Sequence, residues 1–296
     1  MILAAIDIGS NAARLLISDV LPYKDGTVDY TKLNLLRIPL RLGFDVFETG
    51  VIPEEKAKMV IDTMKIYQQL MDLYKVEHYR ACATSAMRDA RNGTEIIQQV
   101  KAETGIDIEI ISGSEEANVI YETHIAENID SQDAFLYIDV GGGSTELTMF
   151  HQGNIVFKES FNIGTIRLLN GLVTDAQMDH FKWFVKTHTR EINNIKAIGS
   201  GGNINKVFSL SKTKEERPLK LELLRDYYKE LSSATIEERM HLYNIRRDRA
   251  DVIVPALQIY TCVMRWAGAQ EIYVPKIGLA DGLIRMLYNK YKTDKG

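Results

Sequence analysis

The sequence is poor in cysteine, lacks long apolar runs and has no excess of basic residues. Cys82 and Cys262 are the only cysteines among 296 residues, and they lie in separate apolar segments. This usage excludes a disulfide-rich scaffold and a cysteine metal site, and it favours reduced thiols in a cytoplasmic protein. Every uncharged apolar segment is shorter than about 18 residues, so we expect no membrane partner.

The charge balance is slightly acidic. The chain has 36 lysines and arginines against 40 aspartates and glutamates, which gives a formal net charge of −4. Such a chain has no general attraction for polyanions, so we expect no nucleic-acid partner. Binding of phosphate groups would therefore require a local positive site.

Two common phosphate-binding motifs are also missing. No pair of glycines has the GxxxxGK spacing of a P-loop followed by serine or threonine. The dinucleotide pattern GxGxxG fails too, because its last position is Glu146 when counted from Gly141 and Ile204 when counted from Gly199.

Short aliphatic segments alternate with longer segments of helical period, which predicts an α/β protein. The length suggests two domains, at roughly 150 residues per domain. A polar cluster, ENIDSQD, separates the two halves, and we place the domains at residues 1–124 and 125–296. The expected strands are 2–8, 79–84, 106–111, 135–140, 145–150, 154–159, 196–198 and 271–274, and the expected helices include 53–74, 86–103, 175–191 and 278–288.

One short pattern occurs once in each half. Residues 6–10 read Ile-Asp-Ile-Gly-Ser and residues 138–142 read Ile-Asp-Val-Gly-Gly. An aspartate before a glycine turn is common turn chemistry, so one copy would carry little weight. Two copies at equivalent places indicate that the halves repeat one structural plan.

The second copy continues into a run of glycines. Three consecutive glycines weaken a strand, so the backbone there either turns tightly or approaches a ligand. A phosphate cradle of successive N–H groups and a plain hairpin turn both fit the pattern. Gly199 and Gly201 mark a second glycine turn, where either a helix N-terminus binds an anion or the backbone packs closely. The glycine run that follows the second copy, with the two hydroxyl residues after it, comprises Gly141, Gly142, Gly143, Ser144 and Thr145.

Charged residues accompany these turns. Asp7, Glu116, Asp139 and Glu146 lie at expected strand ends or helix starts. Carboxylates beside phosphate groups require a hard cation such as Mg²⁺, and a further carboxylate could accept a proton from an attacking water. Arg14 and Arg88 follow two of the turns, where an arginine either grips a phosphate or lies on the surface. Spacing alone does not establish that these groups converge.

Together these segments resemble the exopolyphosphatase and guanosine pentaphosphate phosphohydrolase (Ppx/GppA) family. The resemblance spans nearly the whole chain, and DVGGGSTE with ISGSEEA is its most specific part. The matching segments are IDIGSNAARLLI at 6–17, ATSAMRDARNG at 83–93, IISGSEEA at 110–117, IDVGGGSTEL at 138–147, IGSGGNI at 198–204, RADVI at 249–253 and GLADGLI at 278–284.

The resemblance implies a two-lobed actin-like ATPase and sugar-kinase (ribonuclease H-like) superfold, with mixed sheets flanked by helices. It implies that Glu116 is the general base, and that Asp139, Glu146 and Asp7 hold Mg²⁺, or alternatively Mn²⁺. Asp139 and Glu146 would also belong to the catalytic group. The implied phosphate-binding residues are Asp7, Gly9, Ser10, Asn11, Arg14, Arg88, Gly141, Gly142, Gly143, Ser144, Thr145 and Gly201.

The sequence departs from the family pattern in three places. Ala12 replaces the usual serine, and Ala280-Asp281 stands where an Arg-Glu pair is usual. The larger members carry an additional helical C-terminal domain, and we expect this chain, whose sequence stops at Gly296, to correspond to the short two-domain form.

The expected activity is release of terminal phosphate from inorganic polyphosphate, guanosine pentaphosphate, or both. An ATP-dependent small-molecule kinase of the same superfold and a non-catalytic nucleotide sensor are the alternatives. Assembly as a homodimer is a further possibility that the resemblance raises.

Overall fold

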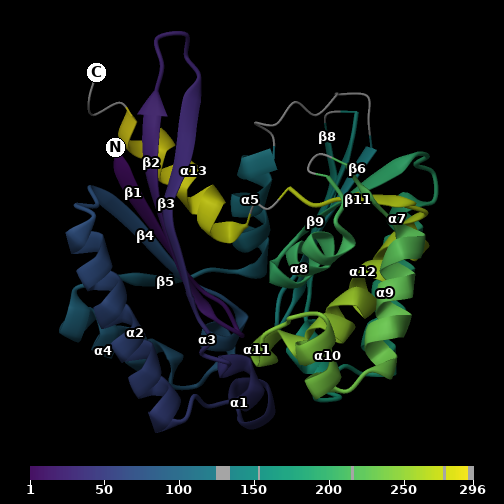
Figure 1. Cartoon of the computed structure of the whole chain (residues 1–296), viewed down its shortest axis with the longest axis horizontal. Coiled ribbons are helices and arrows are strands. Elements are labelled where there is room, and N and C mark those ends of the chain that lie inside the picture. Colours follow the sequence, from purple (N-terminus) through teal and green to yellow (C-terminus); the bar gives the residue numbers. More distant parts are fainter. Residues whose placement is uncertain (125–133, 153, 215–216, 276–277, 293–296) are drawn as a thin grey trace. The chain divides into compact units, whose positions relative to one another are not determined.

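The computed structural model describes residues 1–124, 134–152, 154–214, 217–275 and 278–292 (Figure 1). The chain divides into two compact units. The first comprises Met1–His124 together with Gly278–Gly296, and the second comprises Ile125–Ile277. Each unit has a mixed β-sheet flanked by helices, so the predicted α/β class is confirmed. The polar cluster at 127–133 lies outside the described residues.

The first unit has a five-stranded sheet in the order β3-β2-β1-β4-β5. β1 pairs antiparallel with β2 and parallel with β4, and β2 also pairs antiparallel with β3. The strands are β1 (Ile2–Ile8), β2 (Ala13–Pro22), β3 (Val28–Ile38), β4 (His78–Ala83) and β5 (Ile108–Ile110). The helices are α1 (Leu42–Thr49), α2 (Glu54–Leu73), α3 (Ser85–Asp89), α4 (Gly93–Thr104), α5 (Gly113–His124) and α13 (Leu279–Tyr291).

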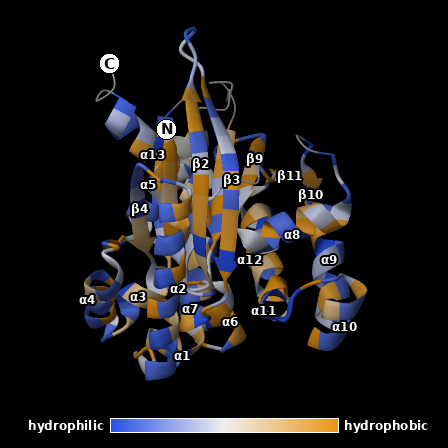
Figure 2. Cartoon of the chain, turned by 60° about the vertical axis from the view of Figure 1, so that its left-hand side comes forward, coloured by the Kyte–Doolittle hydropathy of each residue, from blue (hydrophilic) through white to orange (hydrophobic). Residues whose placement is uncertain are grey.

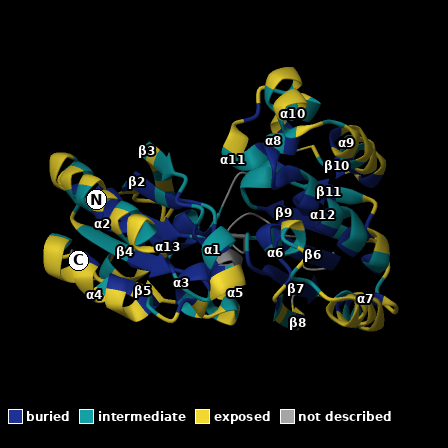
Figure 3. Ribbon diagram, turned by 90° about the horizontal axis from the view of Figure 1, so that it is seen from below, coloured by how far each residue is buried: buried dark blue, intermediate teal, exposed yellow. Residues whose placement is uncertain are grey.

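β1 is buried on both faces, which explains the apolar run that precedes Asp7 in this strand. Ile6 and Ile8 belong to one core cluster with Tyr67 of α2. Leu3 and Ala5, which alternate with them along the strand, belong to another cluster that includes residues of α13. Figure 3 shows the contrast between the largely buried strand β2 and the largely exposed helix α4 of this unit.

Placing the last helix in the second domain was wrong, because α13 packs in the first unit. Leu283 and other apolar residues of α13 share a core with Leu3. Gly282 permits close contact with α5, since an added Cβ would lie 2.3 Å from the Val119 carbonyl oxygen. Asp281 accepts a hydrogen bond from the Gly278 N–H at 2.9 Å and forms an ion pair with Lys32 of β3 at 2.6 Å. The Asp281 departure therefore has a structural role in this chain.

The single helix predicted at 86–103 is divided into α3 and α4. Asn92 lies at the break, and its side chain bonds the Ile52 backbone N–H at 3.0 Å and carbonyl at 2.8 Å. Gly93 follows in tight contact, since an added Cβ would lie 2.2 Å from the Met87 carbonyl oxygen. Ile52 is forty positions from Asn92 in the sequence, and the contact of Gly93 with Met87 exists only once the chain has turned. The helical period of the sequence therefore does not reveal the break between α3 and α4.

The second unit has a six-stranded sheet in the order β10-β11-β9-β6-β7-β8. Its strands are β6 (Ala134–Val140), β7 (Thr145–His151), β8 (Asn154–Phe161), β9 (Ile195–Ser200), β10 (Leu219–Lys220) and β11 (Glu271–Tyr273). Its helices are α6 (Thr165–Leu169), α7 (Asp175–Thr189), α8 (Gly202–Ser211), α9 (Leu221–Ser233), α10 (Ile236–Leu242), α11 (Arg247–Ala250) and α12 (Ile253–Ala267).

The two units repeat one topology. In the first, an antiparallel hairpin β1-β2 is extended by β3 on one side and by the parallel strand β4 on the other. In the second, the hairpin β6-β7 is extended by β8 and by the parallel strand β9 in the same way. The repeated Ile-Asp pattern lies at the corresponding end of β1 and β6, as the sequence predicted.

Apolar residues are concentrated in the strands and in α12, as Figure 2 shows. α12 supplies a large share of the second unit's core, including the fully buried Tyr260. Among the described residues, no helix combines the length and the apolar character that crossing a membrane requires.

Candidate functional site

The glycine turn between β6 and β7 is held from one side by α6 (Figure 3). The carbonyl of Gly141 accepts the Thr165 N–H at 3.0 Å, and that of Gly142 accepts the Ile166 N–H at 2.9 Å. The carbonyl of Gly143 accepts a hydrogen bond from Nε of Arg167 at 2.9 Å. Three successive carbonyls are therefore directed toward the start of α6.

The direction of these carbonyls also fixes the direction of the turn's N–H groups. In a trans peptide unit, the N–H points opposite to the carbonyl of the preceding residue. The N–H groups of Gly142, Gly143 and Ser144 therefore point away from α6. None of the three donates to a backbone carbonyl of a described residue. Successive N–H groups with this orientation form a cradle for anionic oxygens.

Gly164 makes this arrangement possible, although the sequence did not single it out. An added Cβ at Gly164 would lie 2.4 Å from the Gly142 carbonyl oxygen and 2.5 Å from the carbonyl carbons of Gly142 and Gly143. Only a residue without a side chain allows α6 to approach the turn so closely. Arg167 was missed as well, and the FNIGTIR segment has no feature that identifies either residue without the fold.

Thr145 and Ser144 are both buried at the end of this turn. The Thr145 hydroxyl donates to the Ile163 carbonyl at 2.5 Å. Since a hydroxyl has one hydrogen to donate, this bond uses the Thr145 hydroxyl donor and fixes the segment that leads into α6.

Asp139 and Glu146 are directly opposite each other on β6 and β7. Opposed residues of an antiparallel pair have side chains on the same face of the sheet, with Cβ atoms about 4.5–5.5 Å apart. Glu146 is buried, and Ser160 on β8 donates a hydrogen bond to its Oε1 at 2.9 Å. Two carboxylates placed in this way provide the oxygen ligands that Mg²⁺ prefers, with room for waters and substrate oxygens.

The Gly201 turn lies next to Asp139. Gly201 has a φ of +114°, and an added Cβ would be 3.3 Å from Oδ1 of Asp139. The Tyr260 hydroxyl donates to the carbonyl of Ser200. Burial raises the pKa of Tyr260 well above its ordinary value, and the negative charge of Asp139 adds to this effect. Tyr260 is therefore a neutral donor that holds the turn beside the Asp139 carboxylate.

The turn between β1 and β2 is held in the same way, by the N-terminal segment of α1 and the residue before it. The Ser10 carbonyl accepts the Gly43 N–H at 2.8 Å, and the Asn11 carbonyl accepts the Arg41 N–H at 2.9 Å. By the same peptide geometry, the N–H groups of Asn11 and Ala12 point away from that segment. Gly9 has ordinary space for a Cβ, with its nearest contact at 3.5 Å, so close approach does not explain this glycine.

Arginines surround this first turn. Asp7 is buried and forms a 2.5 Å ion pair with Arg14, its partner on β2. Arg14 in turn lies opposite Arg37 on β3. Arg41 precedes α1 in a left-handed conformation, with its guanidinium 3.9 Å from the centre of the Phe44 ring. Arginines from β2, from β3 and from the residue before α1 therefore lie near this turn, and guanidinium groups bind phosphate oxygens through paired N–H donors.

Arg37 and Arg41 are candidate phosphate contacts that the sequence analysis missed. The signal was available in LRIPLRLG at 36–43, where basic residues close an expected strand. Without the pairing of β3 with β2, nothing connected that segment to Arg14 and the first turn.

Ser10 and Arg88 both have structural partners. Oγ of Ser10 lies 2.8 Å from Oγ of Ser85, a buried contact that joins the first turn to the start of α3. Nη1 of Arg88 donates to the Ile111 carbonyl at 2.8 Å. Arg88 thus holds the end of β5, immediately before the segment that leads into α5. Its guanidinium retains further N–H donors, so this bond is compatible with a phosphate contact.

Glu116 lies in the first turn of α5, beside Glu115. Acidic side chains are favoured there by the helix dipole. Glu115 pairs with Nη2 of Arg80 at 3.0 Å, and the same nitrogen lies 2.7 Å from Glu109. Consecutive helical residues point in different directions, so Arg80 engages the first acid of the pair. Asp7 and Glu116 thus belong to the first unit, and Asp139, Glu146 and Gly201 to the second.

Comparison with known proteins identifies the same family as the motifs. A model of the Ppx/GppA phosphatase family matches residues 25–290. The chain is similar to the guanosine-5'-triphosphate,3'-diphosphate pyrophosphatase of Vibrio vulnificus, with 29% identity over 59% of this chain and 34% of the relative. It thus spans about a third of that relative's length. It is also similar to exopolyphosphatase 1 of Mycobacterium tuberculosis, with 24% identity over 96% of this chain and 87% of the relative.

A solved structure shares the fold. The crystal structure of an exopolyphosphatase from Cytophaga hutchinsonii matches with a TM-score of 0.80 and 24% identity, and it covers 98% of both chains. This likeness confirms the predicted actin-like fold.

Proposed function

Since the chain belongs to the Ppx/GppA phosphatase family, and is thus a hydrolase of phosphoanhydride bonds, we propose that it releases terminal phosphate from inorganic polyphosphate, guanosine pentaphosphate, or both. Relatives named exopolyphosphatase and guanosine pyrophosphatase support this choice of substrates. All these substrates present a phosphoanhydride bond at the end of a polyanion, so one set of contacts serves them.

The observation that carries the proposal is the oriented glycine turn of β6-β7. Its three N–H groups point away from α6, and the Asp139-Glu146 pair stands at the base of the same hairpin. A row of N–H groups alone would suit many anions. A row of N–H groups beside two carboxylates suits a phosphate group that arrives with a divalent cation.

Asp139 and Glu146 would hold Mg²⁺, with Asp7 as a further candidate ligand and Mn²⁺ as the alternative ion. The ion, when bound, neutralises charge on the phosphate oxygens. Ser160 orients Glu146 through its hydrogen bond at 2.9 Å, and Gly201 leaves space at Asp139. The remaining charge of the substrate would be met by Arg14 and by the N–H groups of both turns.

Glu116 would act as the general base. Its carboxylate takes a proton from a water as the water oxygen bonds to the terminal phosphorus. The bond from that phosphorus to the bridging oxygen breaks, and the shortened chain leaves with the bridging oxygen. A positioned base of this kind contributes about 10²- to 10⁴-fold to the rate.

The test is release of inorganic phosphate by the full chain with Mg²⁺. Polyphosphate, guanosine pentaphosphate and ATP are compared, each with and without a mixture of small-molecule acceptors. Phosphate release from either of the first two supports the proposal. Loss of ATP only when an acceptor is present would instead indicate a kinase, and binding without turnover would indicate a sensor.

A cytoplasmic location and a homodimer belong to the same proposal. The reduced cysteines and the substrates support the location. Light scattering of the purified chain, over a range of concentrations, tests the dimer.

A further inference from the structure

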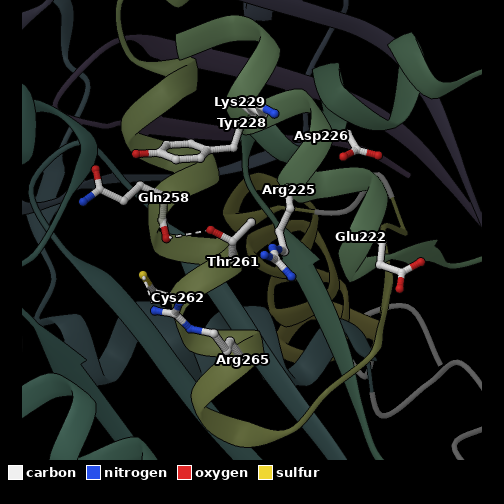
Figure 4. Close-up of a pocket in the computed structure, with 9 residues that line it drawn as sticks. All are labelled: Glu222, Arg225, Asp226, Tyr228, Lys229, Gln258, Thr261, Cys262 and Arg265. Carbon is white, nitrogen blue, oxygen red and sulfur yellow. Dashed lines mark hydrogen bonds between the residues drawn. The ribbon is translucent and has the colours of Figure 1, made fainter. Parts of the chain in front are cut away.

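An open groove with a volume of about 630 Å³ lies between α9 and α12 of the second unit (Figure 4). Each helix contributes one face to it, through residues spaced by three and four positions. None of the lining residues belongs to the site proposed for hydrolysis. They are Glu222, Arg225, Asp226, Tyr228 and Lys229 of α9, and Gln258, Thr261, Cys262 and Arg265 of α12.

The cationic side chains of this groove have no carboxylate partner among the described residues. Arg225, Lys229 and Arg265 form no ion pair there, and Nη2 of Arg265 contacts only Sγ of Cys262, at 3.8 Å. Some exposed arginines elsewhere in the unit do form ion pairs. Arg190 lies 3.0 Å from Glu191, and Arg247 lies 3.7 Å from Glu237.

The two carboxylates of the groove, Glu222 and Asp226, form no ion pair with its arginines or its lysine in the described part of the chain. In Figure 4 the guanidinium of Arg225 points toward Thr261 on the facing helix, whereas Glu222 and Asp226 point away from α12. Arg225 and Arg265 come from different helices, so two guanidinium groups border one space. Guanidinium groups bind phosphate oxygens through paired N–H donors, so both can contact an anion that occupies this groove.

The end of the groove near Tyr228 has a different character. Figure 4 shows the Tyr228 ring and the Gln258 amide together there. An aromatic ring offers a stacking surface for a base, and an amide offers both a donor and an acceptor. A volume of about 630 Å³ lies within the range of sites for small ligands.

We propose that this groove is a second anion site, which binds the triphosphate group of a soluble phosphate compound. Arg225 and Arg265 contact the phosphoryl oxygens, and Lys229 adds positive charge. Both a nucleoside triphosphate and inorganic tripolyphosphate present this group. In the nucleoside form, the base rests on Tyr228.

Cys262 reports occupancy of the groove without any assay of hydrolysis. It is partly exposed and lines the groove, whereas Cys82, the only other cysteine, is 0% exposed. The rate at which a thiol reagent labels Cys262 is measured on the native full chain, with added ATP, added tripolyphosphate or no addition. A C262S variant confirms which cysteine reacts.

Saturating ATP or tripolyphosphate is expected to slow labelling at least about 10-fold. R225Q/R265Q should raise the concentration needed for protection by at least about 100-fold, because each of the two arginines loses a hydrogen bond to a charged group, and each such loss costs about 10-fold or more in affinity. R190Q/R247Q, which removes the same charge from exposed sites, should leave protection unchanged. Tyr228→Leu should weaken protection by ATP alone.

Three results would overturn the proposal. These are labelling that neither compound slows, equal protection in R225Q/R265Q, and equal loss of protection in R190Q/R247Q. Each variant is compared at the same fraction folded, judged by thermal unfolding. Arg265→Lys, which keeps the charge but not the paired donors, is the substitute if Arg265→Gln does not fold, and it should also weaken protection.

Discussion

Replacing Gly164 with alanine tests whether the glycine turn of β6-β7 depends on α6 for its orientation. The added Cβ would lie 2.4 Å from the carbonyl oxygen of Gly142 and 2.5 Å from two carbonyl carbons. Ordinary contacts of this kind begin at about 3.4 Å, so α6 and the turn must separate by roughly 1 Å. All three contacting atoms belong to backbone, which cannot rotate aside.

The expected consequence is a loss of both activity and stability. A displacement of about 1 Å in a positioning group can cost about 10²-fold in rate, so kcat for phosphate release should fall by that order. Overpacking typically costs about 1–3 kcal/mol, which in a chain of this size lowers Tm by roughly 2–10 °C. Gly278→Ala is the matched control, since an added Cβ there meets nothing within 4 Å.

Phosphate release under saturating substrate and thermal unfolding are measured on both variants. Wild-type kcat together with wild-type Tm in Gly164→Ala would show that the turn does not depend on close contact with α6. A lower Tm with unchanged kcat would show that α6 stabilises the unit without orienting the turn.

Three further predictions concern single contacts. Ser160→Ala removes the hydrogen bond to Glu146 and should weaken activation by Mg²⁺ about 10- to 100-fold in a metal titration of phosphate release, whereas an equal metal requirement would argue against Glu146 as a ligand. Arg88→Met should lower Tm by loosening the Ile111 carbonyl, and Arg88→Lys should restore Tm if the bond is purely structural. Burial raises the pKa of Cys82 to about 12, so native protein should bind a proton there that unfolded protein releases above about pH 9. Its contribution to stability should thus be complete below about pH 9 and decline toward pH 12, and a C82A variant should lack this decline in chemical denaturation.

Much of the fold could be predicted because its signals are local. The aliphatic runs ending at Asp7 and Asp139 mark β1 and β6, and small residues after each mark a turn. The repeat of this pattern predicted the repeated topology, because equivalent hairpins and parallel strands follow each copy.

The remaining features depend on contacts between distant segments. Gly164 and Arg167 contact a turn that lies more than twenty positions earlier in the sequence. Their own segment has no feature that distinguishes it from the start of any other short helix. Arg37 becomes a candidate phosphate contact only because the pairing of β3 with β2 places it opposite Arg14. α13 packs in the first unit through apolar contacts with residues such as Leu3, and Gly282 and the Asp281-Lys32 ion pair add contacts to distant segments.

The central claim is that the turns bind the phosphate groups while Glu116 removes a proton from the attacking water. Glu116→Gln keeps the size and polarity of the side chain but cannot accept that proton. Single-turnover phosphate release and equilibrium binding of polyphosphate, measured on this variant, separate the two roles. Release should be slowed by about 10²- to 10⁴-fold, with binding unchanged within a few fold. Release at the wild-type rate would show that Glu116 is not the base.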